Sequence, residues 1–285
     1  MNIMKFRPLF AFISLSLIIA SIVSISLWGF KYSIDFSGGS SWQISLPSNP
    51  SDAQIETIFD DHNLSLTSII STPPKYHLKF ENITTKQKAE LIGSFKQLDP
   101  DFSELQFETL GPLLGRELLK KTLYALILSA VALLIFIGTR FKDMSFGLSA
   151  ILAMLHDTII LLGSFSLLGH FFGAEIDALF VTALLTTLSS STHDTVVTFD
   201  RIRELKLHQQ RLDWVELANR AVSEVLVRSI NNSMTIIFML CALVVLGASS
   251  TRWFATALLI GVISGTYSSV GVAIPLMLLS KKKKK

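Results

Sequence analysis

The sequence is short of charged residues and has almost no cysteine. Charged side chains make up 16% of its 285 residues, against about 25% in a typical soluble protein, whereas hydrophobic residues make up 50%. This balance argues against a purely soluble enzyme. The one cysteine, Cys241, lies in an apolar segment and cannot form an internal disulfide. The sequence therefore excludes a disulfide scaffold and a thiolate metal cluster.

The chain also has no surplus of basic residues once its C-terminus is set aside. Five of the 25 lysines and arginines form the run 281–285, which leaves 20 basic residues against 22 acidic ones. Bulk charge therefore gives no support for a nucleic-acid partner. The sequence offers no nucleophile constellation, phosphate-binding loop or metal-ligand set, so we expect no enzymatic activity, no cofactor and no metal.

The chain contains six long apolar stretches, at residues 9–28, 123–138, 146–169, 178–199, 229–246 and 254–279. A spanning helix needs about 17 to 25 predominantly apolar residues, so the pattern predicts an all-α membrane bundle of six transmembrane helices. The first stretch follows Lys5 and Arg7 as a signal peptide would. It is longer than a signal-peptide core and lacks a small-residue cleavage site, so we expect it to remain as an anchor.

Basic residues beside these stretches are unevenly distributed. If the N-terminus is cytoplasmic, one side carries Lys5, Arg7, Arg140, Lys142 and the basic residues of 200–228 and 281–285, whereas the short loops on the other side carry only Arg252. The positive-inside rule therefore predicts that both termini are cytoplasmic.

This orientation divides the chain into four parts. They are a cytoplasmic stub with the first helix over 1–30, an extracytoplasmic domain over 31–120, helices two to six over 121–280 with a cytoplasmic loop at about 200–228, and a basic tail over 281–285. We interpret the tail as an anchor beside anionic lipid, or else as an addition from expression.

The segment 31–120 differs in composition from the rest, because it is polar and holds 12 of the 22 acidic residues. Alternating apolar and polar residues predict strands at 41–46, 66–71, 76–80 and 103–109. Ser51 and Thr84 or Thr85 are suited to start two helices, the second ending near Leu98. The resulting order βαββαβ predicts a small ferredoxin-like α+β domain. It has no cluster that suggests catalysis, so we expect a binding or transmission role.

Two of the apolar stretches carry polar stripes. In the fourth, one helix face would hold Thr187, Ser190, Ser191, Asp194 and Thr198, and in the fifth another would hold Arg228, Asn231, Asn232 and Thr235. Facing each other, these stripes would form a hydrated slot with Asp194 and Arg228 as its charges. A proton relay needs at least a carboxyl group that can exchange protons, placed beside a guanidinium group that stays charged. A static ion pair that joins the two helices is the equal alternative.

Other polar and small residues inside the membrane need their own explanation. His156 and Asp157 form a second candidate for proton transfer, with hydrogen bonding between helices as the simpler interpretation. His193 is adjacent to Asp194 and points to a different face, so we expect it to be an interhelical hydrogen-bonding residue. A small-residue face for close helix packing is formed by Gly261, Gly265, Ser268 and Ser269.

Several motifs resemble those of the SecD/SecF family. The sequence Asp35-Phe36-Ser37-Gly38-Gly39 is similar to the family's D-F-[ST]-G-G, and residues 110–112 and 155–157 continue the match. The run 194–204, D-T-V-V-T-F-D-R-I-R-E, resembles D-T-V-V-V-F-D-R-I-R-E, while 228–233 resembles R-[ST]-I-N-[TN]-S and 265–269 resembles G-T-Y-S-S. The chain is identified as a family member from about residue 35 to 279. We interpret Asp35, Phe36, Gly38 and Gly39 as a turn in which the glycines supply positive φ.

The resemblance implies a subunit of the bacterial preprotein translocase in the inner membrane. It implies pairing with SecD beside the SecYEG channel, with YajC and YidC as further candidate partners, preproteins as substrates and lipids around the helices. In this family, part of the resistance-nodulation-division superfamily, the proton motive force drives late steps of export, and the important membrane aspartate and arginine fall on Asp194 and Arg228. A non-transporting scaffold of the translocon and a proton-coupled exporter of small molecules or lipids stay open as alternatives.

The sequence departs from the family pattern just before Asp194. Residues 189–193 read S-S-S-T-H, where relatives commonly carry G-Y-S-[IL]-N. The departure keeps the stripe polar and places His193 beside the candidate relay aspartate.

Overall fold

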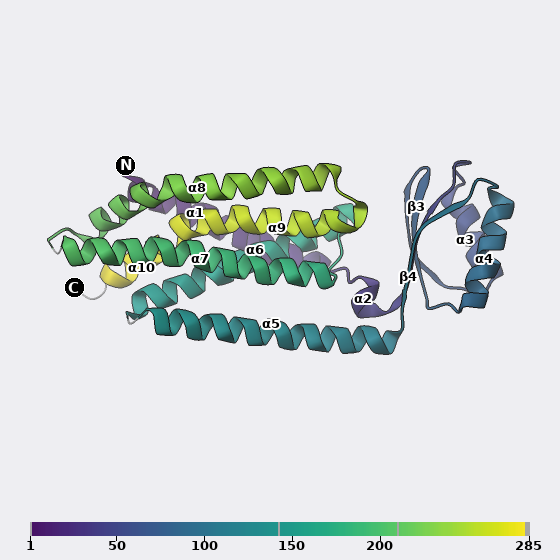
Figure 1. The fold of residues 1–285 in the computed structure, drawn as a ribbon, viewed down its shortest axis with the longest axis horizontal. Coiled ribbons are helices and arrows are strands. Elements are labelled where there is room, and N and C mark those ends of the chain that lie inside the picture. Colours follow the sequence, from purple (N-terminus) through teal and green to yellow (C-terminus); the bar gives the residue numbers. More distant parts are fainter. Residues whose placement is uncertain (1, 142, 210, 283–285) are drawn as a thin grey trace. The chain divides into compact units, whose positions relative to one another are not determined.

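The structure is a computed structural model that describes residues 2–141, 143–209 and 211–282 (Figure 1). The chain folds as two compact units, one formed by Met1–Lys31 and Tyr124–Lys285 and the other by Tyr32–Leu123. Lys142 and the last three lysines of the predicted basic tail lie outside the described residues. Lys281, which begins that tail, makes an ion pair with Asp143.

The first unit consists of long helices, one of which, α5 (Pro112–Arg140), begins within the second unit. Within the described residues, five segments are long and apolar enough to cross a membrane: Ile3–Trp28, Pro112–Arg140, Met144–Phe172, Trp214–Leu246 and Thr251–Lys281. They contain α1 (Arg7–Trp28), α5 (Pro112–Arg140), α6 (Met144–Phe172), α8 (Trp214–Leu246) and α9 (Ser249–Ser268), which continues through a π-helical segment (Ser269–Ala273) into α10 (Ile274–Lys282). The remaining predicted span, 178–199, lies in α7 (Ala178–His208), whose many hydroxyl and charged residues keep it out of this apolar set.

The segment expected as a cytoplasmic loop, about 200–228, is instead largely helical. The helix α7 runs on to His208 and α8 begins at Trp214. Ion pairs hold these helical extensions together, because Arg201 pairs with Glu204 on its own helix at 2.6 Å and with Glu224 on α8 at 2.5 Å. Charged residues in this spacing support helix rather than loop, so helix covers most of the expected loop.

Aspartates at N-caps fix where the long helices begin. Asp143 accepts a hydrogen bond from the Ser145 backbone N–H at 3.0 Å and starts α6, and Asp177 accepts one from Phe180 at 2.6 Å and starts α7. Each satisfies a backbone donor that has no partner within the helix. Gly173 ends α6 in the left-handed conformation, with φ 72°.

The outer faces of the helical unit carry large apolar side chains. Phe12 on α1, Leu128 on α5 and Phe238 on α8 are each about 70% exposed. A soluble protein rarely exposes so much apolar surface, whereas a bilayer solvates it. The exposed faces of these helices are therefore suited to contact lipid.

The second unit follows the predicted order of strands and helices. Its elements are β1 (Gly39–Ser45), α3 (Asp52–Asp61), β2 (Leu66–Thr72), β3 (Lys75–Phe80), α4 (Thr85–Leu98) and β4 (Ser103–Leu110), preceded by the single turn α2 (Ile34–Ser37). The sheet order is β2-β3-β1-β4, and every neighbouring pair is antiparallel. Alternation along β1 and β3 puts Trp42, Ile44 and Leu78 into the core, where Phe95 of α4 packs edge-on against Trp42.

The opposite face of the sheet is polar and includes one perturbed histidine. His77 of β3 has its Nε2 atom 2.7 Å from the Oγ atom of Ser41 on β1. Burial, with a smaller contribution from the charge of Lys79, lowers the pKa of His77 to about 4. The ring is therefore neutral near pH 7, and its Nε2 atom can accept the Ser41 proton.

The motif at residues 35–39 runs from α2 into β1: Asp35 and Phe36, expected in a turn, lie in the single helical turn α2, and the sharp turn itself is at Gly38 and Gly39. Gly38 and Gly39 have φ of 74° and 118°, where side chains other than hydrogen are strained. A Cβ atom on Gly38 would also lie 2.6 Å from the Cα atom of Pro112, and one on Gly39 would lie 2.9 Å from the carbonyl oxygen of Phe80. Both glycines are needed for conformation and for close approach.

We expect the stability of the second unit to fall between pH 6.5 and about 4 because of His77. Its pKa is lower in the folded state than its ordinary value of 6.5, so below pH 6.5 the unfolded chain binds a proton that the folded chain does not. Thermal unfolding of the purified chain from pH 7 to 4 should show this loss, and His77→Gln should reduce it. An equal slope in both proteins would contradict the prediction.

We expect Gly38→Ala to destabilise the second unit by at least about 1–2 kcal/mol, because alanine is strained at this φ and meets Pro112. Gly93, on α4, has nothing within 4 Å of the position of an added Cβ atom, so Gly93→Ala should instead stabilise by about 0.5–1 kcal/mol. Amide exchange in β1 and β3 of the full chain measures both changes. The prediction is wrong if the two variants shift in the same direction.

Candidate functional site

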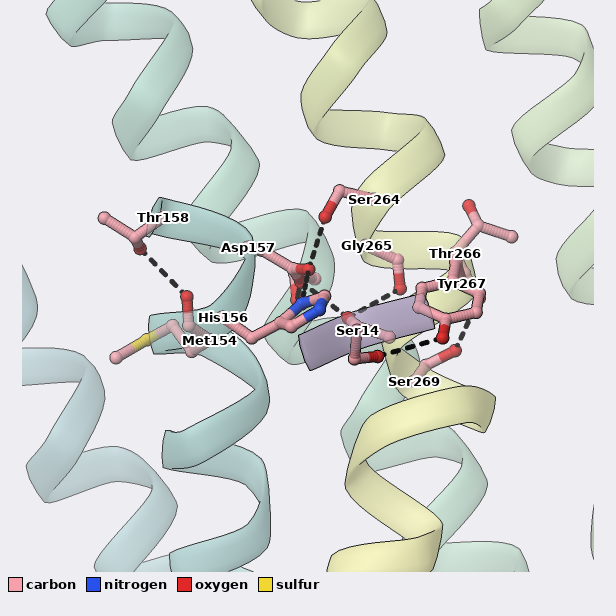
Figure 2. Close-up of polar contacts among 12 residues, drawn as sticks. Ser14, Met154, His156, Asp157, Thr158, Ser264, Gly265, Thr266, Tyr267 and Ser269 are labelled. Carbon is pink, nitrogen blue, oxygen red and sulfur yellow. Dashed lines mark hydrogen bonds and ion pairs between the residues drawn. The ribbon is translucent and has the colours of Figure 1, made fainter. Parts of the chain in front are cut away.

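The carboxyl group of Asp157 on α6 is completely buried and holds three helices together (Figure 2). Its Oδ1 atom accepts a hydrogen bond from Ser264 of α9 at 2.6 Å. Its Oδ2 atom accepts one from Ser191 of α7 at 2.5 Å and one from Ser268 of α9 at 2.6 Å. Both oxygens are thus satisfied by hydroxyl groups from helices that are distant in sequence.

His156 lies beside this carboxyl. Its Nδ1 atom is 3.0 Å from the Oδ1 atom of Asp157, and its side chain is 2% exposed. Among the described residues, the other ring nitrogen, Nε2, has no hydrogen-bond partner. The ring of Tyr267 lies 6.2 Å from the ring of His156, centroid to centroid.

The middle of α9 contacts every other helix of this site. Thr266 hydrogen-bonds to Ser233 of α8 at 2.7 Å. The hydroxyl of Tyr267 donates to the carbonyl of Phe10 on α1 at 2.8 Å. It also lies 2.9 Å from the hydroxyl of Ser14 (Figure 2). The π-helical segment begins directly afterwards at Ser269, whose hydroxyl bonds to the carbonyl of Thr266.

Two glycines let α9 approach α7 closely. A Cβ atom on Gly261 would lie 2.1 Å from the hydroxyl oxygen of Thr187, and one on Gly265 would lie 3.1 Å from the Cβ atom of Ser191. Gly261 and Gly265 therefore bring the two helices close enough for the Ser191 hydroxyl and those of α9 to reach the same carboxyl.

Asp194 and Arg228, the predicted relay pair, are not joined in this structure. Asp194 is half-buried on α7 and Arg228 is exposed on α8. In the part of the chain that the structure describes, no ion pair connects them. Arg228 lines a groove of about 640 Å³ between α7 and α8 with residues that include Asp200, Glu204 and Glu224. Each of these three acids has an arginine partner, whereas Arg228 has none among the described residues.

The predicted stripe on α7 divides into two faces. Thr187, Ser191 and Thr198 are buried, whereas Ser190 and His193 are exposed. Asn231 and Asn232 on α8 are also exposed. The structure thus brings Ser191 to Asp157 and leaves the outward polar groups of both helices uncovered by this chain.

The sequence-based prediction missed two residues of the buried site. Ser264 was not named, Tyr267 was named only as part of the family motif 265–269, and Ser268 was expected only to pack, although its hydroxyl reaches Asp157. The available signal was the spacing of Ser264 and Ser268, four residues apart and so on one helix face. No cluster of three or more histidine, cysteine or acidic residues suited to a metal occurs within the described residues.

The family model described as "Protein export membrane protein SecD/SecF, C-terminal" matches residues 90–283. The chain is 36% identical to the protein translocase subunit SecF of Thermobaculum terrenum, over 94% of this chain and 90% of that protein. It is 33% identical to SecF of Anaerolinea thermophila, over 98% of this chain and 94% of that protein.

Two solved structures have the same fold over nearly the whole chain. The crystal structure of SecDF from Thermus thermophilus, described as a translocon-associated membrane protein, has a TM-score of 0.88 and 30% identity over 99% of this chain. A crystal structure of SecDF in a super-membrane-facing form has a TM-score of 0.72 and 28% identity. The present chain spans 39% of each of those SecDF chains.

We expect Gly261→Ala to destabilise the helical unit by about 1–3 kcal/mol, the usual cost of overpacking. The added methyl group would collide with Thr187, so Thr187→Ala in the same chain should recover part of the loss. Gly138 has nothing within 4 Å of an added Cβ atom, so Gly138→Ala is the matched control and should not destabilise. Thermal unfolding of the purified variants in detergent measures this. An equal effect at both glycines, or no recovery in the double variant, would refute the packing argument.

Proposed function

This chain belongs to the SecD/SecF family and is a multi-pass inner-membrane subunit of the Sec protein translocase, and from that premise we propose that it uses the proton motive force, with SecD, to promote late steps of preprotein export. The relatives are named as translocase subunits, and we assign the chain no hydrolytic or redox reaction.

The observation that carries this proposal is the exposed polar surface of α7 and α8. Arg228, Asn231 and His193 lie on faces that no other part of the described chain covers. Polar and charged groups at membrane depth are costly unless protein or a water-filled cavity surrounds them. A partner with complementary polar groups would remove this cost, and SecD is the natural candidate because the solved relatives are longer SecDF chains.

Our proposed arrangement in the membrane uses six spans. Although α7 is too polar to qualify by composition, its 31 residues make a helix of about 46 Å at 1.5 Å per residue, longer than the roughly 30 Å apolar core of a bilayer. Both termini are then cytoplasmic. The second unit, with its split βαβ order and four-stranded antiparallel sheet, is a ferredoxin-like domain outside the cytoplasm.

Asp194 and Arg228 are the proposed relay. A carboxyl group can take up and release a proton, whereas a guanidinium stays charged. The described structure has no ion pair between them, which favours the relay over a static link. In this proposal the half-buried Asp194 exchanges protons, and Arg228 stabilises its charged form when the partner closes the groove.

The remaining partners follow from this assignment. The chain would act beside SecYEG, with YajC and YidC as accessory proteins. Its substrates would be preproteins in the course of translocation. The second unit, which lacks a catalytic cluster among its described residues, would bind or transmit motion outside the cytoplasm.

We expect Asp194→Asn and Arg228→Met to abolish the increase in preprotein export that a proton gradient produces. Neither asparagine nor methionine can take part in proton exchange or hold the opposing charge. The measurement is export into vesicles that contain SecYEG, SecD and the variant chain, with and without the gradient, after assembly has been verified.

Glu216→Gln and Arg211→Met are matched controls, because both parent residues are exposed and lie outside the proposed relay. They should keep the full gradient response. If the Asp194 and Arg228 variants assemble and export like wild type, the chain is a scaffold and the proton-coupled role is wrong.

A further inference from the structure

The Asp157 carboxyl is separate from the Asp194–Arg228 pair, yet it is the most deeply enclosed acidic group of the helical unit. Its side chain has no exposed surface. Four donors reach it, two on each oxygen: Ser264 and His156 on Oδ1, and Ser191 and Ser268 on Oδ2. A carboxylate has about four acceptor positions, so this cage satisfies the charged form completely.

Among the described residues, no permanently charged cation compensates the negative charge of an ionised Asp157. In the described part of the chain, no lysine or arginine makes an ion pair with Asp157. Two titratable groups lie nearby on α6 and α9, namely His156 and Tyr267. On α7, Asp194 lies three residues beyond Ser191. The helix α1 contributes only the neutral hydroxyl of Ser14, next to Tyr267. A buried carboxylate without a cation is costly, so proton uptake removes a charge that only hydrogen bonds offset.

His156 is positioned to exchange a proton with that carboxyl group. Its Nδ1 atom faces Asp157, while its buried Nε2 atom has no partner among the described residues. When Nε2 gains a proton and Nδ1 passes its own proton to Oδ1, the ring ends neutral and the carboxyl ends protonated. The hydrogen bond between the two groups then reverses direction without any helix having to move.

We propose that His156 and Asp157 form a second proton-binding site of this subunit, coupled to α7 through the Ser191 hydroxyl. The Ser191 hydroxyl carries the coupling, because it donates to the Oδ2 atom of Asp157 at 2.5 Å. Hydrogen bonds connect Ser191, Asp157 and His156, and Asp194 lies three residues beyond Ser191 on the same helix. The inference rests on the proton-coupled function proposed above.

Three variants separate proton binding from helix packing. Asp157→Asn mimics a carboxyl that is permanently protonated. His156→Asn keeps an N–H donor close to the position of Nδ1 but removes the second ring nitrogen. Ser264→Ala removes one of the three hydroxyl donors and no titratable group, so it controls for loss of a hydrogen bond in the same cage.

The first measurement is infrared difference spectroscopy of the complex with SecD in lipid, between neutral and acidic pH. We expect a band from a protonated, desolvated carboxylic acid in wild type and Ser264→Ala, its loss in Asp157→Asn, and a shift in the pH of its appearance in His156→Asn. Persistence of the band in Asp157→Asn would overturn the assignment.

The second measurement is gradient-driven export with the same variants and Asp194→Asn. We expect Asp157→Asn and His156→Asn to lose the gradient-driven increment and Ser264→Ala to keep it. If Asp194→Asn loses the increment while the other two assemble and keep it, the second site is wrong and the proposed function stands. If all three keep it, both are wrong. Should Asp157→Asn not assemble, His156→Asn decides alone, because its donor to Asp157 is preserved.

Discussion

A carboxyl group sealed away from solvent has to be surrounded by hydrogen-bond donors, and this need sets how the central helices meet. The carboxyl oxygens of Asp157 accept hydrogen bonds from the hydroxyl groups of Ser191 on α7 and of two serines on α9, all within 2.6 Å. Helix backbones have to come close for such short side chains to converge, which is what Gly261 and Gly265 permit. The same stretch of α9 then reaches α8 through Thr266 and α1 through Tyr267. The buried acid thus joins α6 to α7 and α9, and α9 in turn contacts α8 and α1.

This arrangement assigns the two polar sides of α7 to different tasks. The inner side, with Thr187 and Ser191, completes the cage of Asp157 and packs against α9. The outer side, with Ser190 and His193, is left exposed by this chain. Asp194 is half-buried between them. Lipid offers no hydrogen-bond partners to the polar groups on either side of α7. Because α7 carries polar residues on two sides, it is less apolar than the neighbouring helices.

Much of this architecture could be predicted from the sequence because its causes are local. Alternation in β1 and β3, cap residues such as Ser51 and Thr84, and the length of apolar runs each act within a few residues. The inward and outward members of the α7 stripe could not be separated, since Ser190 and Ser191 are chemically identical neighbours and only the opposite helix distinguishes them. The role of Ser264 was hidden for the same reason, because its partner is 107 residues away.

The uncovered polar faces of α7 and α8 have a consequence for biosynthesis. Under the proposed pairing with SecD, a copy of this chain without its partner leaves Arg228, Asn231 and Asn232 exposed, which is costly at membrane depth and would favour aggregation or degradation. Cells therefore gain by producing both halves in matched amounts. If both halves are joined in one polypeptide, their amounts are equal by construction. The Thermus thermophilus SecDF, of which this chain matches 35%, is long enough to contain both halves.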